Sequence, residues 1–511
     1  MLGVRTAQTG SARPSTRPFR RSLGAAWALG AVGALVGFAG SWIPSYWGDE
    51  AASVMSAERS WSSLSGVLGR IDAVHGVYYA LLHLWVRAVG TSEIATRLPS
   101  ALAVGVAVAG TVVLVAELTT TRTAIIAGVV CIALPRSTYM ATEARSYALG
   151  TAAAVWLTVL LVRLTRRRSG IRAWMGYVLA AAACIYLFLY LGLILIVHAA
   201  YVLVAHRDQV VLWLRACGLA LLLAAPIVVI GYLQREQIAF LARRDYATPR
   251  NVFIAQWFGD PLIAVIGWTL ITTAAAGLLY AVAGGDGAIP VMLRSRRRLA
   301  GLALIWLLVP TCVLLWVNAV IAPVYNVRYL SMCTPAAAIL VALGSEVIAA
   351  WAAPRLRAAV SIALVAALVI ACIPVYGGQR TPWAKDRGSD WRAAAEYLSQ
   401  HAREGDLIIF DQSTRPSRDP RLMTALYPDR LAGLQDIALT TPYTQRTRLW
   451  DAVQPNAAAV SLRSGPASIW AVEVPAAHAR PDDITMLLHL GFSVEATQRI
   501  HRSTVYHLIR E

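Results

Sequence analysis

Residues 24–43 of this chain read GAAWALGAVGALVGFAGSWI and are followed by PSYWGDE at residues 44–50. The first stretch contains no charged residue and has the length of the ~20 apolar residues that a helix needs to cross a bilayer. Asp49 and Glu50 come directly after it, at the start of a long loop that runs to residue 97. Carboxylates at a membrane surface are solvated, cap a helix or take part in a reaction. We expect this pair to take part in a reaction.

The composition is typical of a membrane protein. The 511 residues are 57% hydrophobic and 14% charged, and the mean hydropathy is +0.56, far from the values of soluble globular domains. The formal net charge is +18, but the arginines gather in short segments between apolar runs, as in cytoplasmic loops of membrane proteins. Membrane orientation therefore explains the charge, and no nucleic-acid partner is predicted. The clusters are Arg13, Arg17, Arg20 and Arg21; Arg163, Arg166, Arg167, Arg168 and Arg172; Arg294, Arg296, Arg297 and Arg298; and Arg355 and Arg357.

If those clusters lie in the cytoplasm, the apolar runs predict about eleven membrane-spanning helices. The predicted segments are 24–43, 98–117, 124–135, 146–162, 174–189, 190–205, 211–233, 261–283, 299–319, 329–350 and 358–376. The third is short and the fifth and sixth are barely separated, which leaves the count open by two. An odd number places the N-terminus in the cytoplasm and the C-terminus outside a cell (plasma) membrane. The predicted units are a basic N-terminus (1–22), a transmembrane domain (23–376) with a large extracytoplasmic loop (44–97), and an extracytoplasmic domain (377–511).

The C-terminal region lacks long apolar runs and has the patterns of an α/β domain. Residues 390–398 (DWRAAAEYL) predict an amphipathic helix capped by Asp390, and residues 406–410 (DLIIF) predict a buried strand. Residues 468–474 and 504–509 predict further strands. We therefore expect a mainly α-helical, polytopic membrane protein with a small α/β domain that has a modest core of its own.

Two outer loops are too long to be simple connections. Loop 44–97 contains two predicted helices, one over residues 50–58 and an apolar one over 76–89 that is too short to span a membrane and is expected at its surface. Loop 234–260 carries arginines that oppose the orientation rule; an anionic ligand would explain them, and a solvated face is the other interpretation. These arginines are Arg235, Arg243, Arg244 and Arg250.

The cysteines predict neither a disulfide framework nor a metal site. All of them fall in apolar segments without the spacing of zinc ligands, which is typical of small buried side chains. Asp49 and Glu50 are neighbours on a predicted helix, so their side chains diverge, and no third ligand is evident. We predict no metal and no other cofactor. The cysteines are Cys131, Cys184, Cys217, Cys312, Cys333 and Cys372.

Several motifs together resemble the GT-C fold integral membrane glycosyltransferases, in particular the protein O-mannosyltransferase-like branch that includes the lipid A aminoarabinose transferases. The motifs are WGDEA at 47–51, HGVYYALLHLW at 75–85, RLPSAL at 97–102, EARSYAL at 143–149 in the fourth span, NVRYL at 326–330 entering the tenth, and DWRAAAEYL at 390–398 followed by GD at 405–406. The chain departs from the family at Gly76, where many members have His-Pro-Pro. The resemblance implies a polyprenyl-phosphate-linked sugar as donor, used on the outer face of the membrane.

Such a donor would need little from the protein. Its leaving group is a phosphodiester that becomes a stable phosphomonoester anion, so no general acid is required. One base for the acceptor hydroxyl and cations for the phosphate suffice, whereas a glycosidase needs two carboxylates. The resemblance implies Asp49 as the catalytic base; the alternative is that Asp49 only caps the helix that begins at Glu50. Glu50 is a second catalytic acidic residue, a salt-bridge partner for an arginine, or solvated.

Arg328 and Arg145 are the predicted ligands of the donor phosphate, with His75 as a further candidate. An arginine at the membrane rim is costly unless it is paired, which marks it as a functional candidate. For Arg145 the alternative is a bracing ion pair with Glu143 or another carboxylate. Arg328 has no acidic residue near it in sequence, so we favour it as a ligand. A lone histidine also has a structural interpretation, and three aromatic residues are expected to anchor at the interface. These are Tyr78, Tyr79 and Trp85.

The predicted function is transfer of a sugar from a polyprenyl phosphate to a cell-envelope glycan, glycolipid or protein, by inverting displacement at the outer face. A mannosyl- or arabinosyltransferase is the implied type. The first alternative is a transporter or flippase of lipid-linked saccharides, although no repeat typical of transporters is evident. The second is a scaffold without activity, against which the retained Asp49, Arg145 and Arg328 argue.

Overall fold

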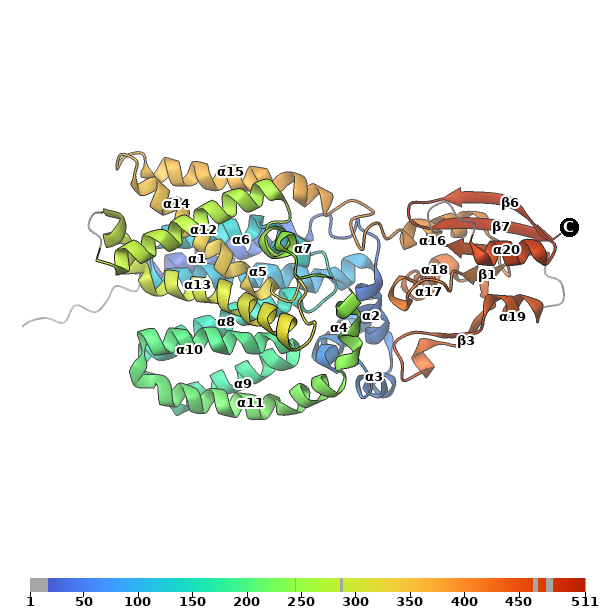
Figure 1. Ribbon diagram of the computed structural model, residues 1–511, viewed down its shortest axis with the longest axis horizontal. Helices are drawn as coiled ribbons and strands as arrows, with labels where there is room; N and C mark the ends of the chain where they lie inside the picture. Colours follow the sequence, from blue (N-terminus) through green and yellow to red (C-terminus); the bar gives the residue numbers. More distant parts are fainter. Residues whose placement is uncertain (1–16, 244, 285–287, 463–466, 475–480, 511) are drawn as a thin grey trace, which may run out of the picture.

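The computed structural model of the protein describes residues 17–243, 245–284, 288–462, 467–474 and 481–510. A bundle of long helices fills one end of the molecule and a sheet-containing domain the other, with short helices between them (Figure 1). All of the predicted spans are helices in this structure. They are α1 (Arg17–Phe38), α5 (Glu93–Leu118), α6 (Thr121–Ala133), α8 (Tyr147–Arg167), α9 (Ile171–Leu187), α10 (Leu193–Ala205), α11 (Val210–Leu233), α12 (Pro261–Val282), α13 (Ala288–Val320), α14 (Thr334–Ala350) and α15 (Arg357–Gly378).

Seven helical stretches among the described residues are long and apolar enough to cross a membrane, and four shorter apolar helices accompany them. The long stretches include α5, α8, α11, α12, α13, α14 and α15; α1, α6, α9 and α10 account for the shorter ones. The burial of these helices distinguishes the centre of the bundle from its rim. In the apolar stretch that includes α14, 94% is buried, whereas in that of α15 only 22% is buried. The fold is thus mainly α-helical and multi-pass, as predicted.

Several boundaries differ from the predicted ones. Helix α1 begins at Arg17, so the predicted N-terminal segment 1–22 loses its last residues to this helix, and residues 1–16 lie outside the described part. Helix α5 begins at Glu93 rather than 98, because the Ser92 hydroxyl accepts a hydrogen bond from the backbone N–H of Ala95 and caps it. Helix α13 begins at Ala288 and therefore includes an arginine cluster that we expected in a loop.

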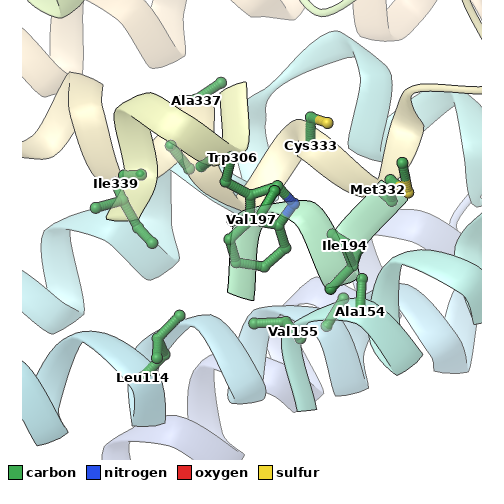
Figure 2. Packing of buried hydrophobic residues seen from close by; sticks show 14 of the residues in the cluster. Leu114, Ala154, Val155, Ile194, Val197, Trp306, Met332, Cys333, Ala337 and Ile339 are labelled. Carbon is green, nitrogen blue, oxygen red and sulfur yellow. The ribbon is translucent and has the colours of Figure 1, made fainter. Parts of the chain in front are cut away.

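The bundle core is a continuous apolar cluster drawn from helices that are distant in sequence. Figure 2 shows Trp306 of α13 beside Val197 and Ile194 of α10, with Met332 close by. Trp306 is fully buried. Helices α1 and α5 approach most closely at two glycines: a Cβ on Gly105 would lie 2.4 Å from the Gly30 carbonyl oxygen. Small residues permit such close helix crossings in membranes, and this crossing fixes the two ends of the first outer loop.

Short helices line the end of the bundle that faces the sheet domain. They are α2 (Gly48–Glu58), α3 (Trp61–Leu68), α4 (Gly76–Val89) and α7 (Pro135–Met140), with the 3₁₀ segments η1 (Ala73–His75), η2 (Leu189–Gly192), η4 (Arg235–Arg243) and η6 (Ser331–Cys333), and the π-helix η5 (Asn251–Ala255). The 3₁₀ segment η3 (Arg207–Gln209) connects α10 and α11 at the opposite end of the bundle (Figure 1). Helices α2 and α4 are the two predicted in the first loop. Tyr78 and Tyr79 of α4 are buried against Leu64 and Leu82, so the prediction that they anchor in the interface is wrong.

The C-terminal domain contains a five-stranded mixed sheet in the order β2-β1-β5-β7-β6. Strand β1 pairs in parallel with β2 and β5, while β7 pairs antiparallel with β5 and β6. The strands are β1 (Leu407–Phe410), β2 (Gln435–Asp436), β5 (Ser468–Glu473), β6 (Phe492–Arg499) and β7 (Thr504–Arg510), and β3 (Leu439–Thr441) and β4 (Ala452–Val453) form a separate pair. Around them lie α16 (Trp391–His401), η7 (Pro416–Arg418), α17 (Leu422–Leu426), α18 (Pro428–Leu431), η8 (Tyr443–Gln445), α19 (Asn456–Ser461) and α20 (Asp482–His489). The predicted strands β1, β5 and β7 are confirmed.

The two faces of this sheet have different partners. Ile409 and Ile469 face a core made only of C-terminal residues, as strand alternation allows. Ile408 and Phe410 face a second core, which α16, α17 and α18 share with Ala51, Val54 and Met55 of α2. The expectation that the domain has a core entirely of its own is therefore correct for one face and wrong for the other.

Two smaller expectations are corrected. Asp390 precedes α16 but its side chain makes no cap bond; it accepts hydrogen bonds from the backbone N–H groups of Arg502 and Ser503. Five of the six cysteines are buried, whereas Cys312 is exposed on α13. The Asp390 carboxylate thus ties α16 to the turn between β6 and β7 instead of to its own helix.

Candidate active site

A cavity of about 510 Å³ lies where the helical bundle meets the C-terminal domain. Four of the five predicted site residues line it: Asp49, His75, Arg145 and Arg328. They come from α2, η1, the turn before α8 and the segment before η6. C-terminal residues complete the lining; they come from the segment between α15 and α16, the loop around η7 and the loop before β4. These are Asp386, Arg415, Pro416, Ser417, Leu449 and Trp450.

Asp49 is the second residue of α2, and its side chain does not cap the helix. Trp47 occupies the cap position without a side-chain bond, so the capping alternative is wrong. The Asp49 carboxylate instead accepts a hydrogen bond from Arg328, with 2.6 Å between Oδ2 and Nη1. Burial opposes ionisation of Asp49, but Arg328 and Arg145 outweigh it and hold the pKa of this carboxyl below its usual value.

Arg328 has the acidic partners that its sequence neighbourhood did not reveal. Besides Asp49, Glu143 lies 3.8 Å from its Nη1. Its guanidinium also lies over two aromatic rings, 4.8 Å from the centre of Trp47 and 5.6 Å from that of Tyr147, a favourable arrangement for a cation. Arg328 is therefore held from several sides while it still lines the cavity.

Arg145 has a different environment. Its Nη1 donates to the carbonyl oxygen of Asp49 at 3.2 Å and lies 3.4 Å from the Tyr79 hydroxyl, and its Nη2 lies 3.2 Å from His75 Nε2. Within the described ranges no carboxylate comes within ion-pair distance of it, so the bracing pair with Glu143 is wrong. Arg145 is only 8% exposed, and its Nε has no hydrogen-bond partner there.

His75 is neutral in this arrangement. Arginine can only donate, so Nε2 of His75 accepts and the ring proton lies on Nδ1. Burial, and then the neighbouring Arg145, lower the pKa of His75 well below its usual value. The ring thus orients the Arg145 guanidinium in the cavity and adds no charge of its own.

Glu50 points away from the cavity. Its two oxygens accept hydrogen bonds from Arg97 Nε and Nη2 at 2.7 and 2.6 Å, and the N–H of Ala144 donates to it as well. Both side chains are fully buried. Of the three interpretations of Glu50, the salt-bridge partner is the one that this geometry fits, and the prediction that it acts with Asp49 is withdrawn.

A second layer of charge lies behind Arg328. Lys385 is the only lysine of the chain and is fully buried; its Nζ donates to Thr142 Oγ1 at 2.8 Å and lies 3.9 Å from Glu143 Oε1. Burial lowers the pKa of Lys385 to about 8, and Glu143 opposes this effect. The carboxylate of Glu143, itself only 1% exposed, sits between the two cations and shares its charge with both. From the sequence, Glu143 was part of a motif and a candidate partner of Arg145; its position between Arg328 and Lys385 was not predicted.

Other residues that line the cavity were missed by sequence reasoning. One wall is aromatic: Tyr190 stacks on Tyr329, with ring centres 4.7 Å apart, and Phe188 and Tyr147 pack beside them. Asp72 and Arg235 line another part. Tyr147 and Tyr329 belong to the EARSYAL and NVRYL motifs, but no sequence pattern assigned either ring to the site. Arg235 was noted among the outer arginines, but Arg243 does not line the cavity and Arg244 lies outside the described residues.

No group of three or more His, Cys, Asp or Glu side chains in the described parts of the chain is placed to hold a metal ion. The prediction about cofactors stays a prediction.

No protein-family model and no curated protein matches the chain. Solved structures do match it. ArnT from Cupriavidus metallidurans is similar to 94% of this chain over 97% of its own length, with a TM-score of 0.55 and 14% identity when bound to undecaprenyl phosphate, and 0.56 and 12% in the apo state. The apo oligosaccharyltransferase of Archaeoglobus fulgidus is similar over 80% of this chain and 64% of its own, with a TM-score of 0.51 and 10% identity.

This chain has the GT-C fold. The similarity to ArnT covers both the helical bundle and the C-terminal domain, whereas the oligosaccharyltransferase is matched over a smaller share of its length. At this level of identity the likeness establishes the fold predicted from the motifs. It does not distinguish the mannosyltransferase-like branch from others.

Proposed function

We propose that this protein transfers a sugar from a polyprenyl-phosphate donor to a cell-envelope glycan, glycolipid or protein on the outer face of the membrane. The acceptor hydroxyl attacks the anomeric carbon with inversion, the bond from this carbon to the phosphate oxygen breaks, and the hydroxyl proton passes to Asp49. Polyprenyl phosphate leaves. The fold shared with ArnT, of which one structure contains undecaprenyl phosphate, supports the donor class. We further propose a mannosyl- or arabinosyltransferase.

The environment of Arg145 supports this proposal most. Among the described residues no carboxylate oxygen lies within ion-pair distance of Arg145, so an anion in the cavity would pair directly with its guanidinium. Arg145 contacts the backbone carbonyl oxygen of Asp49, Arg328 contacts its carboxylate, and both arginines line the cavity in which the phosphate would bind. These cations would also stabilise the charge that grows on the phosphate as the sugar leaves. His75 keeps Arg145 oriented and leaves its charge available for the ligand.

The ion pair between Asp49 and Arg328 would allow donor binding to make the Asp49 carboxylate more basic. Without donor, Arg328 lowers the pKa of Asp49, and a carboxylate with a low pKa accepts protons poorly. A donor phosphate on Arg328 shares this guanidinium and weakens its hold on Asp49. The pKa of Asp49 then rises when the donor is bound, which is when a base is needed.

The orientation of the chain fits an outer-face reaction. The connection between α14 and α15, which carries Arg355 and leads into Arg357 at the start of α15, lies at the end of the bundle away from the C-terminal sheet (Figure 1). Arginine-rich connections favour the cytoplasm, which would put the C-terminal domain and the cavity outside. Because C-terminal loops line the cavity, an acceptor would enter between this domain and the bundle.

The test uses the purified full-length protein in lipid nanodiscs with polyprenyl phosphates that carry mannose, arabinose or galactose. Release of polyprenyl phosphate is measured with and without an envelope extract as acceptor. We expect turnover of one donor, and a loss of about 10²–10⁴-fold in Asp49→Asn with donor binding retained. Asp208→Asn, an exposed carboxylate on η3 that pairs with Arg168, is the matched control and should turn over normally.

If the protein binds a donor but never consumes it, and Asp49→Asn changes nothing, the transferase proposal is wrong. Movement of a fluorescent lipid-linked saccharide across vesicle membranes would then test the transporter alternative.

A further inference from the structure

We propose that Asp72 binds a hydroxyl group of the donor's sugar and thereby takes part in selecting that sugar. This inference rests on the proposed function and adds a residue that no motif in the sequence singled out. Asp72 lines the same cavity as Asp49 and Arg145. Its backbone, its side chain and its distance from the phosphate ligands each support the assignment.

The backbone of Asp72 is held in a conformation that few residues adopt. Its φ of 60° lies in the left-handed region, where Asp and Asn are tolerated better than most residues. Two side chains from the end of α11 and the start of η4 fix it there: Gln237 Oε1 accepts from the Asp72 N–H at 2.8 Å, and Gln234 Oε1 accepts from the Ala73 N–H at 3.0 Å. Such conformations persist where surrounding contacts impose them, commonly at ligand sites.

The side chain of Asp72 is oriented but not used for local structure. Asp72 precedes η1, yet it makes no capping bond to this segment. The Tyr79 hydroxyl donates to Oδ2 at 2.9 Å and so fixes the carboxylate. Within the described parts of the chain Oδ1 makes no hydrogen bond with a protein group. A fixed carboxylate with one oxygen available in a cavity is a strong acceptor for a ligand O–H group.

Asp72 lies near the proposed phosphate ligand Arg145, with the Tyr79 hydroxyl between them. Arg145 Nη1 lies 3.4 Å from the Tyr79 oxygen, which in turn donates to Asp72. Two contacts, of 3.4 and 2.9 Å, therefore link Arg145 to Asp72, and a sugar attached to a phosphate on Arg145 would lie on the side of the cavity that Asp72 lines. A carboxylate would repel the phosphate itself, so the sugar is the part of the donor that it suits.

The test compares two ligands in nanodiscs: bare polyprenyl phosphate, and the same lipid phosphate carrying mannose, arabinose or galactose. Asp72→Asn and Asp72→Gly are both suitable variants because Asn and Gly accept a left-handed backbone. We expect both variants to bind the bare lipid phosphate within twofold of the wild type. The preferred sugar-bearing donor should bind roughly tenfold to a hundredfold more weakly, as expected for the loss of a hydrogen bond to a charged group. Arg328→Ala should weaken both ligands.

Monodeoxy forms of the preferred donor identify the contact. The analogue that lacks the contacted hydroxyl should bind the wild type weakly. Its affinity for the Asp72→Asn variant should be no lower than its affinity for the wild type. Tyr79→Phe should cause a smaller loss in the same direction. If the Asp72 variants keep the full preference for the sugar-bearing donor, or weaken the bare lipid phosphate equally, the assignment of Asp72 is wrong. If the wild type consumes none of the sugar-bearing donors that it binds, the proposed function fails instead.

Discussion

Two ion pairs of similar composition lie on neighbouring residues of one helix and behave differently. Glu50 and Arg97 are both fully buried, and their charged atoms are engaged by several short hydrogen bonds, including those from Arg97 to the carbonyl oxygens of Ser41 and Pro44. The side chains of Asp49 and Arg328 are 31% and 17% exposed and share one hydrogen bond beside a cavity. Adjacent carboxylates therefore reach opposite environments, because successive helical residues point in different directions.

The difference shows what makes an ion pair available for chemistry. A buried pair whose hydrogen bonds are complete offers nothing to a ligand, and its removal exposes a charge to an apolar interior. A partly exposed pair with one contact can exchange a partner at small cost. The two carboxylates are adjacent in sequence and alike in chemistry; their burial and the completeness of their hydrogen bonding distinguish them.

The largest effect should come from breaking the buried pair. Arg97→Met leaves Glu50 buried without its partner and should lower the free energy of unfolding by about 3–5 kcal/mol. The measurement is reversible unfolding in mixed micelles, followed by tryptophan fluorescence. Arg328→Met is the matched substitution in the exchangeable pair and should cost less than Arg97→Met, because Asp49 is partly exposed and Glu143 keeps Lys385 nearby. Equal losses of unfolding free energy in the two variants would contradict the proposed difference between the two ion pairs.

The same Arg328→Met variant should have the larger effect on ligand binding. Removal of a charged donor to phosphate should weaken polyprenyl phosphate binding by roughly tenfold to a hundredfold. A filter or fluorescence titration in nanodiscs at two salt concentrations measures it, since a partly exposed charge is screened by salt. Binding unchanged in this variant would remove Arg328 from the phosphate site.

A third substitution tests whether the two pairs depend on where α2 sits. A Cβ on Gly48 would lie 2.0 Å from the Ser417 carbonyl oxygen, so Gly48→Ala must shift either α2 or the C-terminal loop. Overpacking of this kind costs about 1–3 kcal/mol, and turnover should fall because Asp49 is the next residue. Gly66→Ala on α3 is the control: its Cβ would meet only Thr447 Cγ2 at an ordinary 3.4 Å.

The smallest expected effect is on the pH dependence of stability, through the buried amino group of Lys385. Burial lowers the pKa of Lys385 to about 8 from 10.5. Between these values the unfolded chain retains a proton that the folded chain has released, so stability rises with pH across this window, while below pH 8 the full cost of the buried charge remains. From pH 7.5 to 9 the wild type should gain about 1 kcal/mol of unfolding free energy relative to Lys385→Met. Parallel thermal unfolding of the two proteins measures it, and a constant difference across this range would contradict it.

The sequence predicted the membrane bundle well because apolar length is a strong local signal. All of the predicted spans are helices, and three strands and two surface helices of the loops also lie where their periodicity placed them. Errors at the ends have local causes, such as the Ser92 cap that starts α5 early. The short helix α7, between the third and fourth spans, was not predicted, since its few residues carry no periodic pattern.

The sequence predicted most residues of the candidate site but not the contacts between them. Asp49, Arg145, Arg328 and His75 all line one cavity. That Asp49 binds Arg328, across most of the transmembrane region, depends on tertiary packing that no sequence window contains. Asp72 was not predicted for the same reason: its proposed role depends on a left-handed backbone conformation and on glutamines from another loop, which no local sequence pattern shows.

Helix α2 has a consequence for protein engineering. It supplies apolar side chains to one core of the C-terminal domain while its first turn carries Asp49 into the cavity. A C-terminal fragment cut after α15 would leave that face of the sheet uncovered, and such a face favours aggregation. Chimeras that exchange C-terminal domains between proteins of this fold should therefore transfer α2 with the domain, although the two segments lie more than three hundred residues apart. The unit of exchange is a three-dimensional contact surface rather than a continuous stretch of chain.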